Sequence, residues 1–307
     1  MSKPRVGFIG VGMMGHGMAK NLVLKGFSTS VLGHHNRAPV DDLVGRGAKE
    51  ARDPADLAVR SDIVLLCVTG SPQVEAVVYG PKGLLSAARQ GLIVVDCSTS
   101  EPDSTAKIRA DFAPKGVPFV DAPLARTPKE AEEGRLNVMV GAEPATYAAI
   151  EPVLRAFAEN IFHVGGPGAG HKIKLINNFF AMGQAALIAE ALVATVKAGL
   201  DVETLFKLVS VGAPNSGIFQ MIVPSVLAGT YDGLKFGLEL ARKDMRYYTH
   251  MTESLGLPSV FGELVHQTFV QASALGFGGE MVGGLVKAQE RVTGVTVGRQ
   301  AVRSAAE

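Results

Sequence analysis

Short apolar runs recur through the first half of the chain, separated by longer stretches in which apolar residues have helical spacing. The runs predict strands over residues 6–9, 29–32, 63–68, 93–96, 119–121 and 137–140, with residues 161–164 as an edge strand. Strands that alternate with helices form a parallel sheet with helices on both faces. The first half is therefore predicted to be an α/β domain with a doubly wound parallel sheet.

The second half has a different pattern, because strand-like runs stop after the glycine-rich segment 165–170. Helical periodicity dominates from Lys172 onward, and further helices are expected near Val202, Ile218, Leu238 and Ser259. A chain of 307 residues exceeds the usual size of one domain. We expect an α/β domain over 1–165 and an all-helical domain over 166–307, with a long connecting helix at about 170–198 and a solvated tail over 299–307.

Three glycines, Gly10, Gly12 and Gly15, follow the first predicted strand and precede a predicted helix. Glycine lets the backbone approach a pyrophosphate closely, and a helix N-terminus supplies free N–H groups and a partial positive charge. The spacing predicts a dinucleotide-binding loop, and a plain strand-to-helix turn is the alternative. The predicted loop consists of Gly10, Val11, Gly12, Met13, Met14 and Gly15.

The type of dinucleotide depends on the end of the second predicted strand, where a carboxylate would bind the ribose 2′-hydroxyl of NAD and repel a 2′-phosphate. This stretch has no carboxylate and three potential cations, in the segment His34, His35, Asn36 and Arg37. The segment favours NADP(H) over NAD(H), although the histidines alone would also fit a solvated loop. Loops after the next two strands should flank the cofactor, with Val68, Thr69 and Thr99 as candidate contacts.

A candidate catalytic group lies near the start of the long connecting helix. Lys174 and Asn178 are four residues apart and share a helix face, with Asn177 beside them. A carbonyl that receives a hydride becomes an alkoxide, so the reaction needs a nearby proton donor and positive charge. Lysine supplies both, and an exposed lysine without a catalytic role is the alternative.

The charge, the cysteine count and the apolar stretches of the chain limit which kinds of ligand and which location in the cell are expected. Thirty basic and 29 acidic residues give a net charge of +1, which argues against a nucleic-acid-binding surface and favours a small-molecule partner. Two isolated cysteines match no metal-ligand spacing, so no metal is expected. The N-terminal segment lacks the pattern of a secretory signal, and Gln184 and Glu190 interrupt the most apolar stretch. We therefore expect a cytoplasmic protein with no membrane span.

Several motifs together resemble the β-hydroxyacid dehydrogenase family, which includes 3-hydroxyisobutyrate dehydrogenase and tartronate semialdehyde reductase. They occur in order over nearly the whole chain, at residues 8–15, 96–99, 121–123, 174–178 and 243–244. The resemblance implies a Rossmann-type domain followed by a helical domain, and a homo-oligomer, either a dimer or a tetramer. It also implies that Lys174 is the catalytic acid/base, that Asn178 contacts the substrate and that Lys243 lies near the cofactor and substrate.

The expected substrate loop departs from the family pattern. Many members have Ser-Gly-Gly where this chain has Leu124, Ala125, Arg126 and Thr127. An arginine here offers a forked cation for an anionic substrate. The Arg-Thr pair is similar to the loop of bacterial sulfolactaldehyde reductases, in which that arginine engages the sulfonate. The alternative is that Arg126 turns outward or pairs with Glu130.

These observations predict an NAD(P)-dependent oxidoreductase that interconverts a short anionic aldehyde, such as a semialdehyde or sulfolactaldehyde, and its primary alcohol. The enzymatic alternatives are 3-hydroxyisobutyrate dehydrogenase and tartronate semialdehyde reductase. The non-enzymatic alternative is a catalytically silent nucleotide-binding module. The predicted substrate-binding set is Leu124, Ala125, Arg126, Thr127, Lys174, Asn177, Asn178 and Lys243.

Overall fold

A computed structural model describes residues 3–298, and the expected tail at 299–307 lies outside the described residues. The chain divides into two compact units, Met1–Lys174 and Leu175–Glu307. The division falls inside one long helix, α8 (Ala169–Lys197), which contains the last residues of the first unit and the first residues of the second.

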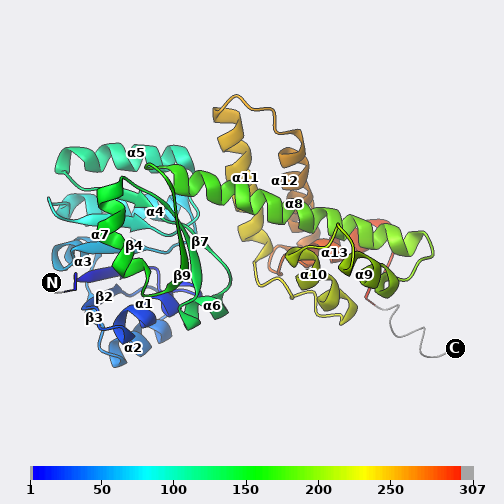
Figure 1. The fold of residues 1–307 in the computed structure, drawn as a ribbon, viewed down its shortest axis with the longest axis horizontal. Helices are drawn as coiled ribbons and strands as arrows, with labels where there is room; N and C mark the ends of the chain where they lie inside the picture. Colours follow the sequence, from blue (N-terminus) through cyan, green and yellow to red (C-terminus); the bar gives the residue numbers. More distant parts are fainter. Residues whose placement is uncertain (1–2, 299–307) are drawn as a thin grey trace. The chain divides into compact units, whose positions relative to one another are not determined.

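The first unit is built on one nine-stranded sheet of order β3-β2-β1-β4-β5-β6-β8-β7, with β9 paired to β8 (Figure 1). Its first six strands are parallel neighbours, and β8 runs antiparallel to β6 and β7. The strands are β1 (Val6–Ile9), β2 (Thr29–Leu32), β3 (Lys49–Ala51), β4 (Ile63–Leu66), β5 (Ile93–Asp96), β6 (Phe119–Asp121), β7 (Leu124–Ala125), β8 (Leu136–Gly141) and β9 (Ala158–Gly165).

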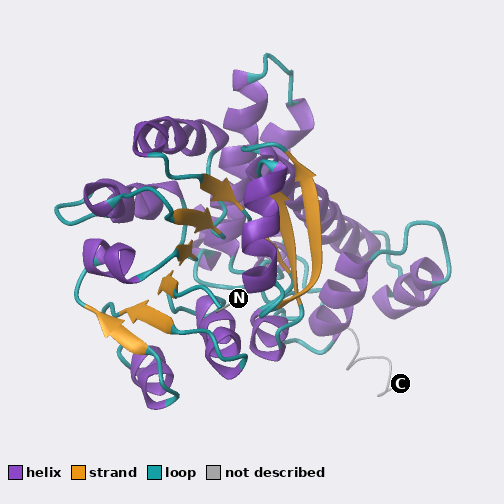
Figure 2. Cartoon of the chain, turned by 60° about the vertical axis from the view of Figure 1, so that its left-hand side comes forward, coloured by secondary structure: helices purple, strands orange, loops and turns teal. Residues whose placement is uncertain are grey.

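Helices cover both faces of this sheet (Figure 2). One core contains Phe8 with side chains of α1, α2 and α7, and the other contains Ile9 with side chains of α3, α4 and α5. Successive residues of β1 thus enter opposite cores, which explains why its sequence is continuously apolar. The helices are α1 (Gly15–Leu24), α2 (Ala38–Gly45), α3 (Pro54–Arg60), α4 (Ser71–Tyr79), α5 (Pro102–Phe112), α6 (Pro128–Glu133) and α7 (Pro144–Leu154).

The described part of the second unit is helical, apart from an isolated bridge between Gly237 and Met281. It consists of α8 from Leu175 onward, α9 (Val202–Ser210), α10 (Gly217–Leu227), α11 (Leu238–Ser254), α12 (Val260–Ala272) and α13 (Gly284–Thr293), with a π-helical segment at Ser273–Phe277. By length and composition α8 could cross a membrane, but a soluble core helix passes the same test, and Leu175, Ala189 and Leu192 of α8 are fully buried in this unit's core.

The structure confirms the predicted fold class, an α/β sheet domain followed by a helical domain. The sequence pattern does not predict β3 or β7. β3 has two exposed residues, Lys49 and Glu50, and β7 has only two residues, so neither gives an apolar run. The sheet is parallel from β3 to β6, as predicted, and the sequence pattern does not predict that β8 pairs antiparallel with β6 and β7.

Candidate active site

The turn between β1 and α1 contains three glycines that have different reasons to be glycine. At Gly10 the φ angle is +98°, and an added Cβ would lie 2.2 Å from the Cys67 carbonyl oxygen. At Gly15 a Cβ would lie 1.9 Å from the Gly10 carbonyl oxygen. At exposed Gly12 a Cβ would meet no atom of the described residues within 4 Å. The protein's own packing therefore explains Gly10 and Gly15 but not Gly12.

The space at Gly12 fits a bound dinucleotide. No described side chain caps the start of α1, and its first turn contains no acidic residue. A helix N-terminus without a cap has free backbone N–H groups, and the backbone at Gly12 leaves room beside them. Such a site suits a pyrophosphate. The predicted loop follows the carboxyl end of β1, and Met13 is exposed in it. Its residues are Gly10, Val11, Gly12, Met13, Met14 and Gly15.

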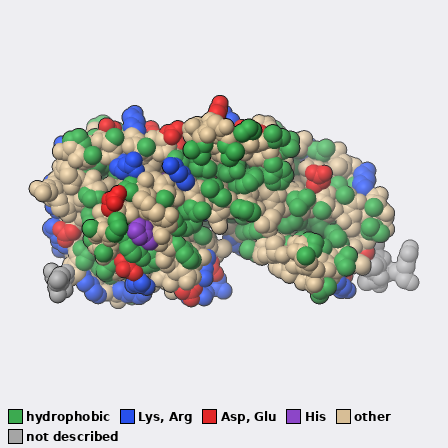
Figure 3. All heavy atoms as spheres, turned by 45° about the horizontal axis from the view of Figure 1, so that its top comes forward, with side chains coloured by type: hydrophobic (Ala, Val, Ile, Leu, Met, Phe, Trp, Pro, Cys, Tyr) green, Lys and Arg blue, Asp and Glu red, His purple; other side chains and the backbone are tan. Residues whose placement is uncertain are grey.

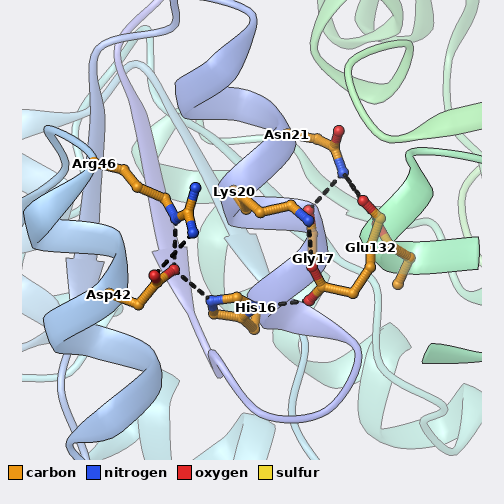
Figure 4. A network of polar contacts seen from close by, with 8 residues as sticks. His16, Gly17, Lys20, Asn21, Asp42, Arg46 and Glu132 are labelled. Atoms are coloured by element: carbon orange, nitrogen blue, oxygen red, sulfur yellow. Dashed lines mark hydrogen bonds and ion pairs between the residues drawn. The ribbon is translucent and has the colours of Figure 1, made fainter. Parts of the chain in front are cut away.

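A polar network holds α1 against α2 and α6 just behind this turn (Figure 4). His16 Nδ1 lies 2.7 Å from Glu132 Oε1, and His16 Nε2 lies 2.9 Å from Asp42 Oδ2. Lys20 also pairs with Glu132, and Arg46 donates to Asp42 over 2.6 Å. The hydrogen bonds from Arg46 and then His16 lower the pKa of Asp42 to about 2. The network fixes the helix whose N-terminus forms the loop.

The end of β2 carries the residues expected to select the cofactor, and His34, His35, Asn36 and Arg37 are all exposed there. Arg37 makes a two-pronged ion pair with Glu50 of β3, over 2.6 and 3.0 Å, and also contacts Asp41 at 3.0 Å. The stretch itself has no carboxylate, but folding brings two carboxylates to its arginine. Sequence reasoning misses Glu50 because it omits β3.

The loops after β4 and β5 meet at the same edge of the sheet. The Val68 backbone N–H donates to Ser98 Oγ over 2.9 Å, which ties the loop with Val68 and Thr69 to the loop with Thr99. Thr69 is exposed and Thr99 is half-buried. The adjacent Cys67 is half-buried, and desolvation of its thiol first, then the Asp96 carboxylate, raises the pKa of Cys67 to about 12.

Lys174 lies in the second turn of α8 and is only 9% exposed, so it is not a solvated lysine. Asp121, at the end of β6, positions the start of this helix. Its two carboxylate oxygens accept the backbone N–H groups of Gly168, over 2.6 Å, and His171, over 2.9 Å. Sequence reasoning gives Asp121 no role, although a carboxylate at a strand end is a recognisable cap for a following helix N-terminus.

Asn178 is buried on α8, and its amide nitrogen donates to Asp244 Oδ2 of α11 over 2.6 Å. Lys243 Nζ lies 2.8 Å from the other Asp244 oxygen and 4.7 Å from the centre of the Tyr247 ring. Folding thus brings Asn178 and Lys243 together through Asp244. Asn177 is exposed. Asp244 is missing from the predicted site, although the Lys243-Asp244 pair is among the family motifs.

The expected substrate loop leaves the sheet at β7, which contains Leu124 and Ala125. Arg126 has a φ angle of +82°, and its guanidinium pairs with Glu159 of β9 and donates to the Arg135 carbonyl over 2.5 Å. Arg126 is exposed, which agrees with the alternative that it turns outward, but its partner is Glu159 and not Glu130. Glu130 Oε2 instead accepts the Thr127 backbone N–H at 3.0 Å and the Thr127 hydroxyl at 2.6 Å. Those hydrogen bonds lower the pKa of Glu130.

Both halves of the chain match family models of nucleotide-dependent dehydrogenases. Residues 5–165 match the NAD-binding domain of 6-phosphogluconate dehydrogenase, and residues 168–288 match the NAD-binding model of NADP-dependent 3-hydroxyisobutyrate dehydrogenase. With the glycine turn and the buried lysine, these matches define an NAD(P)-dependent oxidoreductase. The chain belongs to the β-hydroxyacid dehydrogenase family.

Individual relatives agree with this assignment. The chain is 34% identical to 2-(hydroxymethyl)glutarate dehydrogenase of Eubacterium barkeri, over 95% of this chain and 97% of the relative. It is 32% identical to 3-sulfolactaldehyde reductase of Escherichia coli strain K12, over 89% of this chain and 91% of the relative. The crystal structure of 3-hydroxyisobutyrate dehydrogenase from Salmonella typhimurium matches with a TM-score of 0.81 and 26% identity, over 92% of this chain and 99% of that one.

Proposed function

We propose that the enzyme interconverts a short aldehyde that bears an anionic group and the corresponding primary alcohol. The observation that carries the proposal is the buried Lys174 on the same face of α8 as Asn178. The nicotinamide, when bound, supplies or accepts the hydride. In the reductive direction the carbonyl oxygen takes a proton from Lys174 Nζ as its carbon receives the hydride, and the amide of Asn178 orients that oxygen. The reverse reaction returns the proton to the amine.

The anionic group of the substrate is proposed to bind at Arg126, with Thr127 and Lys243 as further contacts. Arg126 stands at a backbone conformation that favours glycine, which an arginine occupies only at a cost in stability. An arginine retained at such a position supports a role for its charge. Glu159 holds the guanidinium in the described structure, so a substrate anion would have to replace that carboxylate. The names of the relatives above, with a glutarate and a sulfonate, support an anionic substrate.

The experiment is NADPH and NADH oxidation by the purified protein with sulfolactaldehyde, succinic semialdehyde, tartronate semialdehyde and methylmalonate semialdehyde. Oxidation of 2-(hydroxymethyl)glutarate is measured in the reverse direction. Lys174→Ala should abolish turnover of every compound. Arg126→Gly should raise the KM of the preferred anionic substrate, while Arg135→Ala, which removes a nearby arginine paired with Glu133, should not. Retained turnover in Lys174→Ala would refute the proposed chemistry.

The cofactor is proposed to be NADP(H), with NAD(H) as the alternative. The absence of a carboxylate between residues 33 and 37, as the sequence has it, and the NADP-dependent family model support this preference. The carboxylates of Glu50 and Asp41 beside Arg37 reduce the positive charge available to a 2′-phosphate. If the Arg37 guanidinium still contacts the 2′-phosphate, Arg37→Ala should lower kcat/KM for NADPH and leave that for NADH unchanged. An equal loss with both cofactors would refute this role.

A cytoplasmic homo-oligomer, a dimer or a tetramer, is proposed as the working form. Large apolar side chains are exposed on the helices of the second unit, whose surface is seen in Figure 3. Phe180 and Leu187 of α8 are each 66% exposed, and Leu264 of α12 is 61% exposed. Exposed apolar groups of this size favour association. Light scattering after gel filtration tests the proposal, and Leu187→Glu should shift the mass towards the monomer.

A further inference from the structure

A buried polar cluster lies where β5 and β6 end and α5 and α8 begin, entirely within the first unit. Asp96 and Asp121 are register partners on neighbouring parallel strands, and both are fully buried. Asp121 accepts the two backbone N–H groups at the start of α8 described above. Asp96 accepts the Ser98 backbone N–H over 2.9 Å and the Ser100 hydroxyl over 2.8 Å, so it shapes the loop that contains Thr99.

His171 is the side chain that lies between these two groups. It is fully buried in the first turn of α8, and its Nδ1 lies 2.7 Å from the Thr105 hydroxyl oxygen of α5. Its Nε2 lies 3.6 Å from Asp96 Oδ2 and has no hydrogen-bond partner among the described residues. The ring therefore joins α5 through Nδ1 and faces the Asp96 carboxylate with Nε2.

The position of His171 distinguishes it from a residue that merely supports the helix. Asp121 already accepts two backbone N–H groups at the start of α8, so the capping of the helix does not depend on the imidazole. The imidazole contacts α5 and faces the end of β5, so it fixes how α8 is rotated and placed against the Thr99 loop. Lys174 follows three residues later on the same side of the helix.

We propose that His171 is a positioning residue. It fixes the position of Lys174 relative to the Thr99 loop, and thereby relative to the cofactor. This inference rests on the proposed function, in which Lys174 Nζ transfers the proton. Asp96 links the loop to the helix, because it accepts the Ser98 backbone N–H in the Thr99 loop and faces the imidazole of His171 on α8. Removal of the imidazole leaves the cofactor loop and the helix formed but lets their relative placement vary. The rate of chemistry should fall more than the affinity for either ligand.

The test compares His171→Leu, His171→Gln and His171→Asn, each measured for kcat, substrate KM, NADPH affinity and thermal unfolding. A misplacement near 1 Å costs about 100-fold in rate. In His171→Leu, kcat should fall by about this factor while KM and NADPH affinity change little. The amide nitrogen of Gln matches Nε2 and can face Asp96, so His171→Gln should recover most of kcat. Asn matches only the Nδ1 side, so His171→Asn should recover less.

Three outcomes would overturn the proposal. They are an unchanged kcat in His171→Leu, a loss that appears equally in KM and NADPH affinity, and a Gln variant no better than Leu. Thr105→Val, which removes the hydroxyl at constant size, replaces His171→Leu if that variant fails to fold, and its kcat should fall with KM unchanged. Lys174→Ala is measured in parallel. Activity that survives in Lys174→Ala refutes the proposed function, whereas activity lost there but kept in His171→Leu refutes only the positioning role.

Discussion

Gly12→Ala should separate cofactor binding from folding, because the two depend on different glycines of the same turn. Within residues 3–298 an added Cβ at Gly12 meets nothing within 4 Å, and the φ angle there is outside the left-handed region. Loss of backbone freedom in the unfolded chain should then stabilise the variant by about 0.4–1 kcal/mol. Without cofactor, Gly12→Ala should therefore unfold at the wild-type temperature or slightly above it.

The effect on the cofactor should have the opposite sign. The new methyl group occupies the space that a pyrophosphate approaches, and an extra methyl in a tightly packed site costs about 1–3 kcal/mol. This cost corresponds to a cofactor affinity lower by about 5- to 150-fold. Quenching or enhancement of NADPH fluorescence measures the affinity, and thermal or urea unfolding without cofactor measures the stability.

Two matched variants make this test decisive. A Cβ at Gly45, at the end of α2, also meets no described atom within 4 Å, so Gly45→Ala should gain similar stability and bind NADPH normally. Gly10→Ala should lose stability, because its Cβ would lie 2.2 Å from a carbonyl oxygen and its φ angle is +98°. Wild-type NADPH affinity in Gly12→Ala, or a loss of its stability before cofactor is added, would refute the reasoning.

Three further predictions concern the first unit. The pKa of Cys67 is raised from 9.0 to about 12, and that of Cys97 is also raised. At pH 8 a disulfide reagent should therefore modify Cys67 about 1000-fold more slowly in the native protein than in guanidinium, and a fast reaction in the native protein would contradict this. Because the pKa of Asp42 is lowered in the folded protein, its stabilising contribution is complete above about pH 4 and is lost as the pH falls towards 2. In Asp42→Asn the free energy of unfolding should therefore fall less steeply between about pH 4 and pH 2, and an unchanged pH dependence would refute the role of its ion pairs. Thr127→Ala should lower the free energy of unfolding in urea by about 1 kcal/mol, because Thr127 caps α6, whereas Thr127→Ser should keep most of it.

The parts of the fold that the sequence predicts are those with a periodic signal of their own. β1, β2, β5 and β6 have the predicted bounds, because helices cover both faces of their sheet and bury almost every residue of these strands. β3 lies at the sheet edge with an exposed Lys49 and Glu50, so its sequence gives no such run. Helix α8 shows the same dependence, since Ala185, Ile188 and Leu192 have helical spacing in the sequence and are buried in the core of the second unit.

The candidate site is predictable where its residues are neighbours along the chain. The four-residue spacing of Lys174 and Asn178 alone places them on one helix face. The contacts between Arg37 and Glu50, and between Asn178 and Asp244, join separate elements, so they depend on strand order and helix packing. Burial of Lys174 is likewise a property of the folded chain, which is why an exposed lysine is an equal alternative in the sequence.

The loop from Ala125 to Thr127 is closed at both ends by contacts that do not involve the side chain of Arg126. β7 pairs with β8 before it, and the capping box of Thr127 and Glu130 begins α6 after it. Because Arg126 occupies a glycine-like backbone conformation, Arg126→Gly relieves strain while it removes an exposed ion pair worth about 0–1 kcal/mol. Position 126 can therefore gain or lose its positive charge by one substitution at almost no cost in the stability of the fold.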